Sequence, residues 1–171
     1  MANSTDTLVE YSLGRTDAAE SAPIIRSLVD TVGVTLAGFD SDVIEALDRW
    51  GHTELAPGDA VVWGRSQTAS SSRAALINGT AAHALDFDDA APSMPMHPSA
   101  VIWPAVLAWT DVHETDTDTV LRAADIGQTV FRAIGEALPM KVHYARGWHS
   151  TATVGRLAAT ASLIPLAGLT A

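Results

Sequence analysis

Histidines and aspartates gather in short polar clusters that are suited to proton-transfer chemistry. The clusters run from His83 to Asp89, from His97 to Ser99 and from Lys141 to Thr151. Histidine is the side chain whose ordinary pKa lies nearest neutrality, so two of them facing one cavity can give and take protons at ordinary pH. The clusters therefore predict an acid–base site for a small molecule. The histidines that they contain are His83, His97, His143 and His149.

An aspartate beside a histidine gives this chemistry an orienting group. A carboxylate that accepts a hydrogen bond from an imidazole fixes its tautomer and stabilises its protonated form. We expect Asp86 to have this role for His97 or His149. The alternative is structural: the aspartates would form a solvated turn at a helix end, and His97 would be a polar residue ahead of a helix that begins at Pro98.

The cluster around His149 has the composition of an anion-binding helix start. Ser150 and Thr151 follow His149 at a predicted helix amino terminus, where backbone amides and the helix dipole favour a carboxylate. Lys141 and Arg146 add positive charge in an otherwise acidic chain. The alternative for these two cations is ordinary solvated surface.

The same residue types allow a metal site. Histidine and aspartate side chains are hard or borderline ligands, and an aspartate-rich turn on a helical scaffold can hold magnesium. The aspartates of this turn lack the four-residue spacing that faces one ligand from a helix, and no glycine provides an EF-hand loop. We therefore expect no metal. The ligands of the alternative would be His83, Asp86, Asp88, Asp89 and His97.

Composition and missing motifs exclude other functions. The chain has 171 residues, no cysteine and a formal net charge of −10, which predicts one cytoplasmic domain that avoids nucleic acid and anionic lipid. No signal peptide or membrane span is predicted. No glycine-rich phosphate loop occurs, and Ser99 lacks the setting of a nucleophile elbow, so we expect neither nucleotide binding nor serine hydrolysis. No cofactor is expected.

Apolar residues recur at three- and four-residue steps through most of the chain, which predicts an all-α fold. Pro57, nearby glycines and the β-favouring stretch 60–63 predict an irregular connection with one extended segment. Pro139 is expected to end the fifth helix. The predicted helices cover about 18–39, 41–50, 69–84, 98–113, 118–138 and 150–166.

Several motifs together resemble the MmgE/PrpD family, and the resemblance covers nearly the whole chain. The most specific are Asn78 to Asp89, with its Asp-Phe-Asp-Asp sequence, the His97-Pro98-Ser99 motif and the stretch from Arg146 to Thr153. The family includes 2-methylcitrate dehydratase, cis-aconitate decarboxylase and iminodisuccinate epimerase. The resemblance thus implies metal-independent elimination, decarboxylation or epimerisation of small di- or tricarboxylates.

The family's motifs imply roles for individual residues. Asp86, His97 and His149 would be the catalytic residues, with one histidine moving a proton on the carbon next to a carboxylate and Asp86 orienting the pair. Which histidine is the acid and which the base stays open. Where decarboxylase-like members have a threonine after the Asp-Phe-Asp-Asp motif, this chain has Ala90. We expect substrate contacts from His83, Lys141, Arg146, Ser150 and Thr151.

Length limits what the resemblance implies. Members of the family carry an α/β lid domain after a helical domain, whereas residues 1–171 correspond to the amino-terminal helical domain alone. We therefore expect a homodimeric half-site of a carbon–oxygen lyase or epimerase that turns over little without a lid, as a fragment or as one chain of a split enzyme. The alternative is a non-catalytic dimerisation or pseudoenzyme domain.

Overall fold

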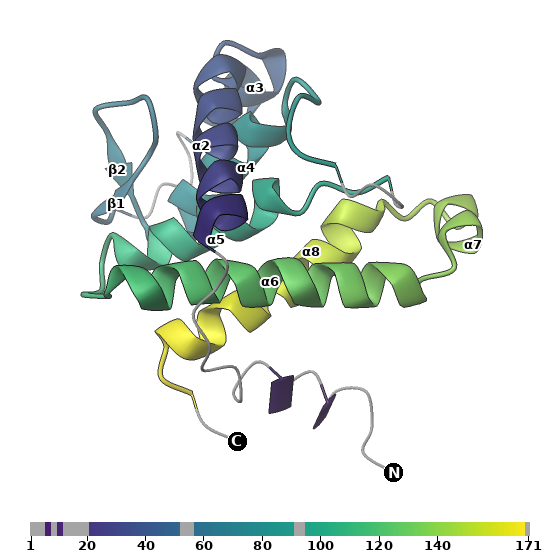
Figure 1. The fold of residues 1–171 in the computed structure, drawn as a ribbon. Coiled ribbons are helices and arrows are strands. Elements are labelled where there is room, and N and C mark those ends of the chain that lie inside the picture. Colours follow the sequence, from purple (N-terminus) through teal and green to yellow (C-terminus); the bar gives the residue numbers. More distant parts are fainter. Residues whose placement is uncertain (1–5, 8–9, 12–20, 52–56, 91–94, 170–171) are drawn as a thin grey trace.

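The fold is all-α, as predicted, with one small two-stranded ribbon (Figure 1). The computed structural model describes residues 6–7, 10–11, 21–51, 57–90 and 95–169. Within this part of the chain the helices are α2 (Ser21–Gly38), α3 (Asp42–Gly51), α4 (Ser71–His83), α5 (Ser99–Thr110), α6 (Thr117–Ala137), α7 (Met140–Ala145) and α8 (Ser150–Leu166).

Helix α5 is the centre of the fold. It packs against α4, α8, α6 and α2, and its side chains Ile102, Trp103 and Val106 are fully buried. Its composition explains this position, because α5 is apolar on all sides, and a helix of that kind is stable only when other elements surround it. The helices that surround α5 also bring the polar clusters of the sequence to one side of it.

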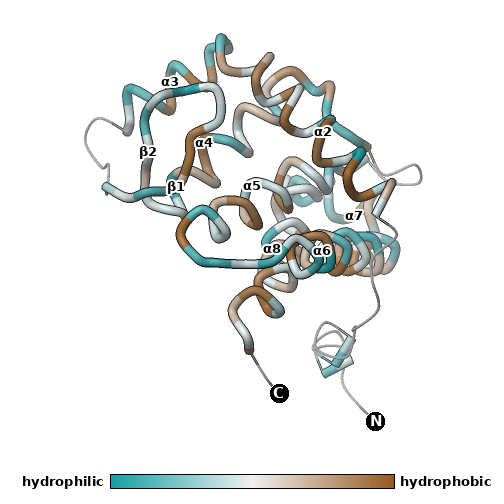
Figure 2. The backbone as a smooth tube through the Cα atoms, turned by 60° about the vertical axis from the view of Figure 1, so that its left-hand side comes forward, coloured by the Kyte–Doolittle hydropathy of each residue, from teal (hydrophilic) through white to brown (hydrophobic). Residues whose placement is uncertain are grey.

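Amphipathic helices form the outer layers. Hydrophilic and hydrophobic residues alternate along α6, which lies against α8 and crosses the middle of the view in Figure 1 (Figures 1 and 2). Its start is fixed by Asp116, whose carboxylate accepts hydrogen bonds at 2.8 Å from the backbone N–H and from the hydroxyl of Thr119. The aspartate thus satisfies an amide group that would otherwise lack a partner at the start of the helix.

Close approach between α2 and α4 depends on Gly38, the last residue of α2. A Cβ atom at this position would overlap the backbone carbonyl of Ala81 in α4. The glycine therefore allows the two backbones to come into contact. This contact packs the last turns of α4, which ends at His83, against α2.

Two local predictions need correction. Residues 140–145, expected as part of a loop, form the short helix α7, and residue 69 lies in a strand rather than at the start of a helix. The strands β1 (Ala60–Val61) and β2 (Thr68–Ala69) pair in antiparallel register, with Ala60 opposite Ala69. The extended segment expected at 60–63 is thus a two-residue strand, and six residues separate it from its partner strand.

Length and apolar composition bear on whether the described helices could cross a membrane. None of them is both long and apolar enough to do so singly, and only the bent pair formed by α2 and α3 passes on length and composition.

Candidate active site

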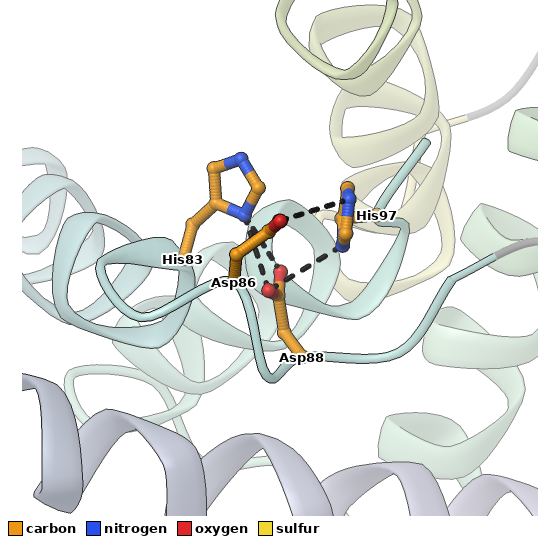
Figure 3. Close-up of side chains that lie close together, drawn as sticks. All are labelled: His83, Asp86, Asp88 and His97. Carbon is orange, nitrogen blue, oxygen red and sulfur yellow. Dashed lines mark hydrogen bonds and ion pairs between the residues drawn. The ribbon is translucent and has the colours of Figure 1, made fainter. Parts of the chain in front are cut away.

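Two histidines and two aspartates meet between the end of α4 and the start of α5 (Figure 3). His83 is the last residue of α4, Asp86 and Asp88 lie in the turn that follows, and His97 lies just ahead of α5. The imidazole rings of the two histidines have their centroids 4.6 Å apart. The sequence clusters 83–89 and 97–99 are therefore one site in space.

Asp88 is the buried carboxylate of this site. Its two oxygens lie 3.0 and 3.1 Å from Nδ1 of His83, and one of them lies 3.4 Å from Nδ1 of His97. The hydrogen bond to Asp88 raises the pKa of His83 above its ordinary value, against the opposing effect of burial. Asp88 thus occupies the orienting position that sequence reasoning assigned to Asp86.

Asp86 lies on the solvent side of the same site. Its side chain is 78% exposed, and one oxygen lies 3.4 Å from Nε2 of His97. Its backbone is left-handed, with φ of +56°, a conformation that aspartate and asparagine adopt more readily than other side chains. This reversal of the chain turns Asp88 back beneath the two rings (Figure 3). The catalytic role of Asp86 stays a prediction.

A second carboxylate fixes the other end of the turn. Asp89 accepts a hydrogen bond from the backbone N–H of Ser99 at 3.0 Å and another from the Ser99 hydroxyl, which itself accepts from Gln128 of α6 at 2.8 Å. Burial raises the pKa of Asp89. The turn that carries Asp88 is therefore tied to both α5 and α6. No pattern in the sequence indicated Gln128.

The start of α8 brings the third cluster to the same place. The ring of His149 has its centroid 6.0 Å from that of His83, and Thr151 accepts a hydrogen bond from the backbone N–H of His97 at 3.1 Å. The structure thus brings together three residues that the sequence analysis gave catalytic or substrate-contact roles: His83, His97 and His149. Their substrate-related roles stay predictions.

Ser150 and Tyr144 hold the start of α8 in place. Ser150 is fully buried, and its hydroxyl lies 2.7 Å from the Tyr144 hydroxyl and 3.0 Å from the carbonyl oxygen of Pro95. The Tyr144 ring meets His149 edge-on, with centroids 6.1 Å apart. Sequence reasoning missed Tyr144, although an aromatic residue with a polar tip inside a histidine cluster was a signal that could have identified it.

A cavity of about 520 Å³ opens beside these histidines. His83 and His149 line it together with Thr80 and Thr151. His97, whose ring is next to that of His83 and whose side chain is 16% exposed, is not among the lining residues. Among the described residues that line this cavity there is no lysine or arginine. The remaining lining residues are Val43, Ala75, Leu76, Gly79, Ala84, Ala100, Val101 and Ala152.

The two basic residues expected to contact substrate lie elsewhere. Arg146, directly after α7, lines a separate hollow of about 310 Å³, and Lys141 is exposed on α7 and lines neither cavity. The structure therefore does not bring these cations to the histidine cavity, and their contact with substrate stays a prediction.

The cluster also has the donor set of a metal site. One ligand atom from each of His83, Asp86, Asp88 and His97 can be chosen so that all four lie within 4.8 Å of one another. Two imidazoles and two carboxylates suit a divalent cation such as zinc or manganese. The expectation of no metal assumed helical spacing of the aspartates, but α4 ends at His83 and the aspartates lie in a turn with left-handed backbone at Asp86.

The geometry is suited to proton transfer. With Nδ1 of His83 held by Asp88, its Nε2 is left for a ligand, and a buried carboxylate stabilises the protonated ring. A cavity lined by His83 and His149 can present two proton-carrying groups to one small molecule.

Comparison with known proteins agrees with the fold. Residues 6–171 match a protein family described as MmgE/PrpD N-terminal domain. Cis-aconitate decarboxylase of Mus musculus is 29% identical over 87 residues, which cover 50% of this chain and 18% of the mouse protein. The aligned part thus spans less than a fifth of that relative. Because the family match extends over nearly every residue, including all of the helices and the histidine cavity, the chain belongs to the MmgE/PrpD family through its N-terminal domain.

Proposed function

We propose that this chain supplies the histidine–aspartate half of a site that moves a proton on a small di- or tricarboxylate, in a metal-independent lyase of the dehydratase or decarboxylase type or in an epimerase. The observation that carries the proposal is the convergence of His83, His97 and His149 beside one cavity, with Asp88 buried between two of the rings. Family membership supports a dehydratase- or decarboxylase-type enzyme.

The reactions open to such a site all change the bonds of a carbon atom next to a carboxylate. In a dehydration, a neutral imidazole takes the proton from the carbon next to a carboxylate, a carbon–carbon double bond forms, and the hydroxyl leaves as water after a second imidazole protonates it. In a decarboxylation, the carbon–carbon bond to the carboxylate breaks, carbon dioxide leaves, and the carbon that keeps the electron pair takes a proton from a protonated imidazole. In an epimerisation, the proton leaves one face of the carbon and another returns to the opposite face.

His149 and His97 are the proton-transferring pair in this proposal. His149 lines the cavity, and His97 lies between Asp86 and Asp88 with both ring nitrogens 3.4 Å from carboxylate oxygens. His83, bonded to Asp88, holds a substrate carboxylate through Nε2 when it is protonated.

The charge of the cavity explains why further polypeptide is needed. Polycarboxylates require fixed cations, and the described residues that line the cavity offer only histidines. The proposal therefore includes positive groups and a cover from a lid, on the same polypeptide or on a separate chain. The homodimer expected for this domain belongs to the same proposal.

Deuterium exchange tests the proposal directly. The chain, alone and with any adjacently encoded lid protein, is incubated with a panel of di- and tricarboxylates in D₂O, and NMR follows deuterium entering the carbon next to a carboxylate. We expect the parent chain to exchange this hydrogen for deuterium. His97→Asn and His149→Asn should each lower the exchange rate by about 100-fold or more. The matched control is His113→Asn, because His113 is exposed and stacks on Trp109 instead of lining the cavity.

Two outcomes would contradict the proposal. Exchange that survives both site variants would place the chemistry elsewhere. No exchange with any substrate or lid protein, together with an unchanged fold, would favour the non-catalytic dimerisation domain.

A divalent-cation site is a second candidate function, favoured by the four convergent ligand atoms. Metal analysis of protein purified without added chelator distinguishes the cation site from the proton-transfer site. Stoichiometric zinc, manganese or magnesium that is lost in Asp88→Asn would overturn the metal-independent assignment. Deuterium exchange that EDTA leaves unchanged would support the metal-independent assignment.

A further inference from the structure

A second hollow lies beside the start of α8 and shares no lining residue with the histidine cavity. Its volume is about 310 Å³, within the range of small-ligand sites. Helix α8 contributes Thr151 and Ala152 to the first cavity and Thr153 and Arg156 to the second. The full lining of the second hollow is Leu138, Pro139, Val142, His143, Arg146, Trp148, Thr153 and Arg156.

The hollow is positively charged within an acidic protein. Arg146 and Arg156 both line it, and none of its lining residues is acidic. Glu136 is the last acidic residue of the sequence, so residues 137–171 contain cations without any aspartate or glutamate, although the whole chain carries a formal charge of −10. Neither guanidinium forms an ion pair with another residue that the structure describes. Two unpaired guanidiniums in one hollow are typical of a site for oxyanions.

Two other features prepare the hollow for a ligand. The Thr153 hydroxyl donates to the carbonyl oxygen of His149 at 3.0 Å, so at 3.1 Å it accepts from Nε2 of His143 and holds that ring in place. Apolar walls come from Leu138, Val142 and Trp148, and the Trp148 side chain is 58% exposed. Apolar walls with a few converging polar groups are the usual composition of a small-molecule site.

We propose that this second hollow binds a small organic oxyanion, a polycarboxylate or an organic phosphate, through the guanidinium groups of Arg146 and Arg156. The carbon skeleton of the ligand packs against Trp148 and Val142, and its charged groups face the two arginines. The inference does not depend on the proposed function, because it concerns a different cavity with different residues.

Anion titration of the chain tests the site. Citrate, glycerol 3-phosphate and inorganic phosphate are added at constant ionic strength, and binding is followed by tryptophan fluorescence and by the NMR signals of the arginine Nε–H groups. We expect saturable binding, with a fluorescence change that Trp148→Phe removes. Arg146→Gln and Arg156→Gln should each weaken the affinity by about tenfold or more, because each removes a charge-assisted hydrogen bond.

Two variants serve as controls. Arg132→Gln removes an exposed arginine of α6, and His113→Asn removes an exposed histidine; neither residue lines either cavity. Both should bind the anion with unchanged affinity. Tighter binding of citrate would assign a polycarboxylate, and tighter binding of glycerol 3-phosphate an organic phosphate.

Three results would overturn the inference. The first is the absence of saturable binding by any of the three anions. The second is an affinity that the two arginine substitutions leave unchanged. The third is binding that His149→Asn abolishes, which would assign the anion to the histidine cavity.

Discussion

At the scale of single residues, the site depends on which aspartate the turn after α4 buries. Asp88 lies beneath the rings of His83 and His97, whereas Asp86 stays 78% exposed and supplies the left-handed backbone that reverses the chain. One residue therefore provides the charge that orients the histidines, and the other provides mainly the shape of the turn. The two roles lead to separable predictions.

The bond between His83 and Asp88 predicts a pH-dependent contribution to stability. Because the folded-state pKa of His83 is raised above its ordinary value of 6.5, its protonation stabilises the fold fully below pH 6.5, and this contribution is lost as the pH rises through the raised value. We expect His83→Asn to lower the free energy of unfolding more at about pH 5.5 than at about pH 8. Urea denaturation with a chelator present measures this, and an equal loss at both pH values would contradict it.

The backbone of Asp86 predicts different results for three substitutions. Asp86→Asn keeps a side chain that tolerates positive φ, and Asp86→Gly removes the strain altogether, so both should unfold within about 0.5 kcal/mol of the parent chain. Asp86→Ala should lose about 1 kcal/mol, because its Cβ carries the strain without a compensating polar group. Thermal unfolding measures these differences, and equal stability of the three variants would contradict them.

The sequence allowed the residues of the site to be predicted better than its geometry. Residue types and family motifs identified His83, Asp86, His97 and His149, which the structure brings together. They could not show that Asp88 is the buried carboxylate, because helical periodicity does not extend into a turn and the positive φ at Asp86 reverses the direction of the chain.

At the scale of elements, long amphipathic or apolar segments were predictable and short ones were not. The segments that became α2, α6 and α8 show apolar repeats over many turns, and their observed bounds lie close to those expected. Helix α7, with six residues, is too short to show a periodic pattern, and its place is set by contacts such as that between Tyr144 and Ser150. Pairs of two-residue strands give equally little signal.

The contact between α2 and α4 predicts a large effect of one methyl group. Gly38→Ala should destabilise the fold by about 1–3 kcal/mol, because the added Cβ meets the rigid backbone carbonyl of Ala81. Gly33→Ala in the same helix is the control, since a Cβ there has no neighbour within 4 Å among the described residues. It should leave stability unchanged or raise it by up to about 1 kcal/mol. Chemical denaturation of both variants checks the difference.

At the scale of the whole molecule, charge is distributed unevenly. The chain has 20 acidic and 10 basic residues, yet no acidic residue follows Glu136. Residues 137–171, which contribute His149 and the arginine hollow, are therefore the part of the chain that can attract an anion, while the rest of the surface repels it.

Repulsion among the acidic residues predicts a stabilising effect of salt. Raising sodium chloride from about 10 mM to about 150 mM shortens the screening length from about 30 Å to about 8 Å. We expect the unfolding temperature at pH 7 to rise, because a net charge of −10 opposes the compact state. Replacing the exposed Glu114 and Glu136 by glutamine removes two negative charges and should reduce the rise. A fall in unfolding temperature with salt would contradict the expectation.

The hydrogen bond between the His97 amide and Thr151 has a consequence for the order in which the site is made. These residues are 54 positions apart, so a nascent chain leaving the ribosome exposes α4, α5 and α6 before Thr151 has been synthesised. Until α8 emerges, the histidine cavity lacks one wall and the apolar surface of α6 that α8 covers stays open to solvent. The growing polypeptide should therefore depend on chaperones most strongly in the interval between the release of α6 and the release of α8.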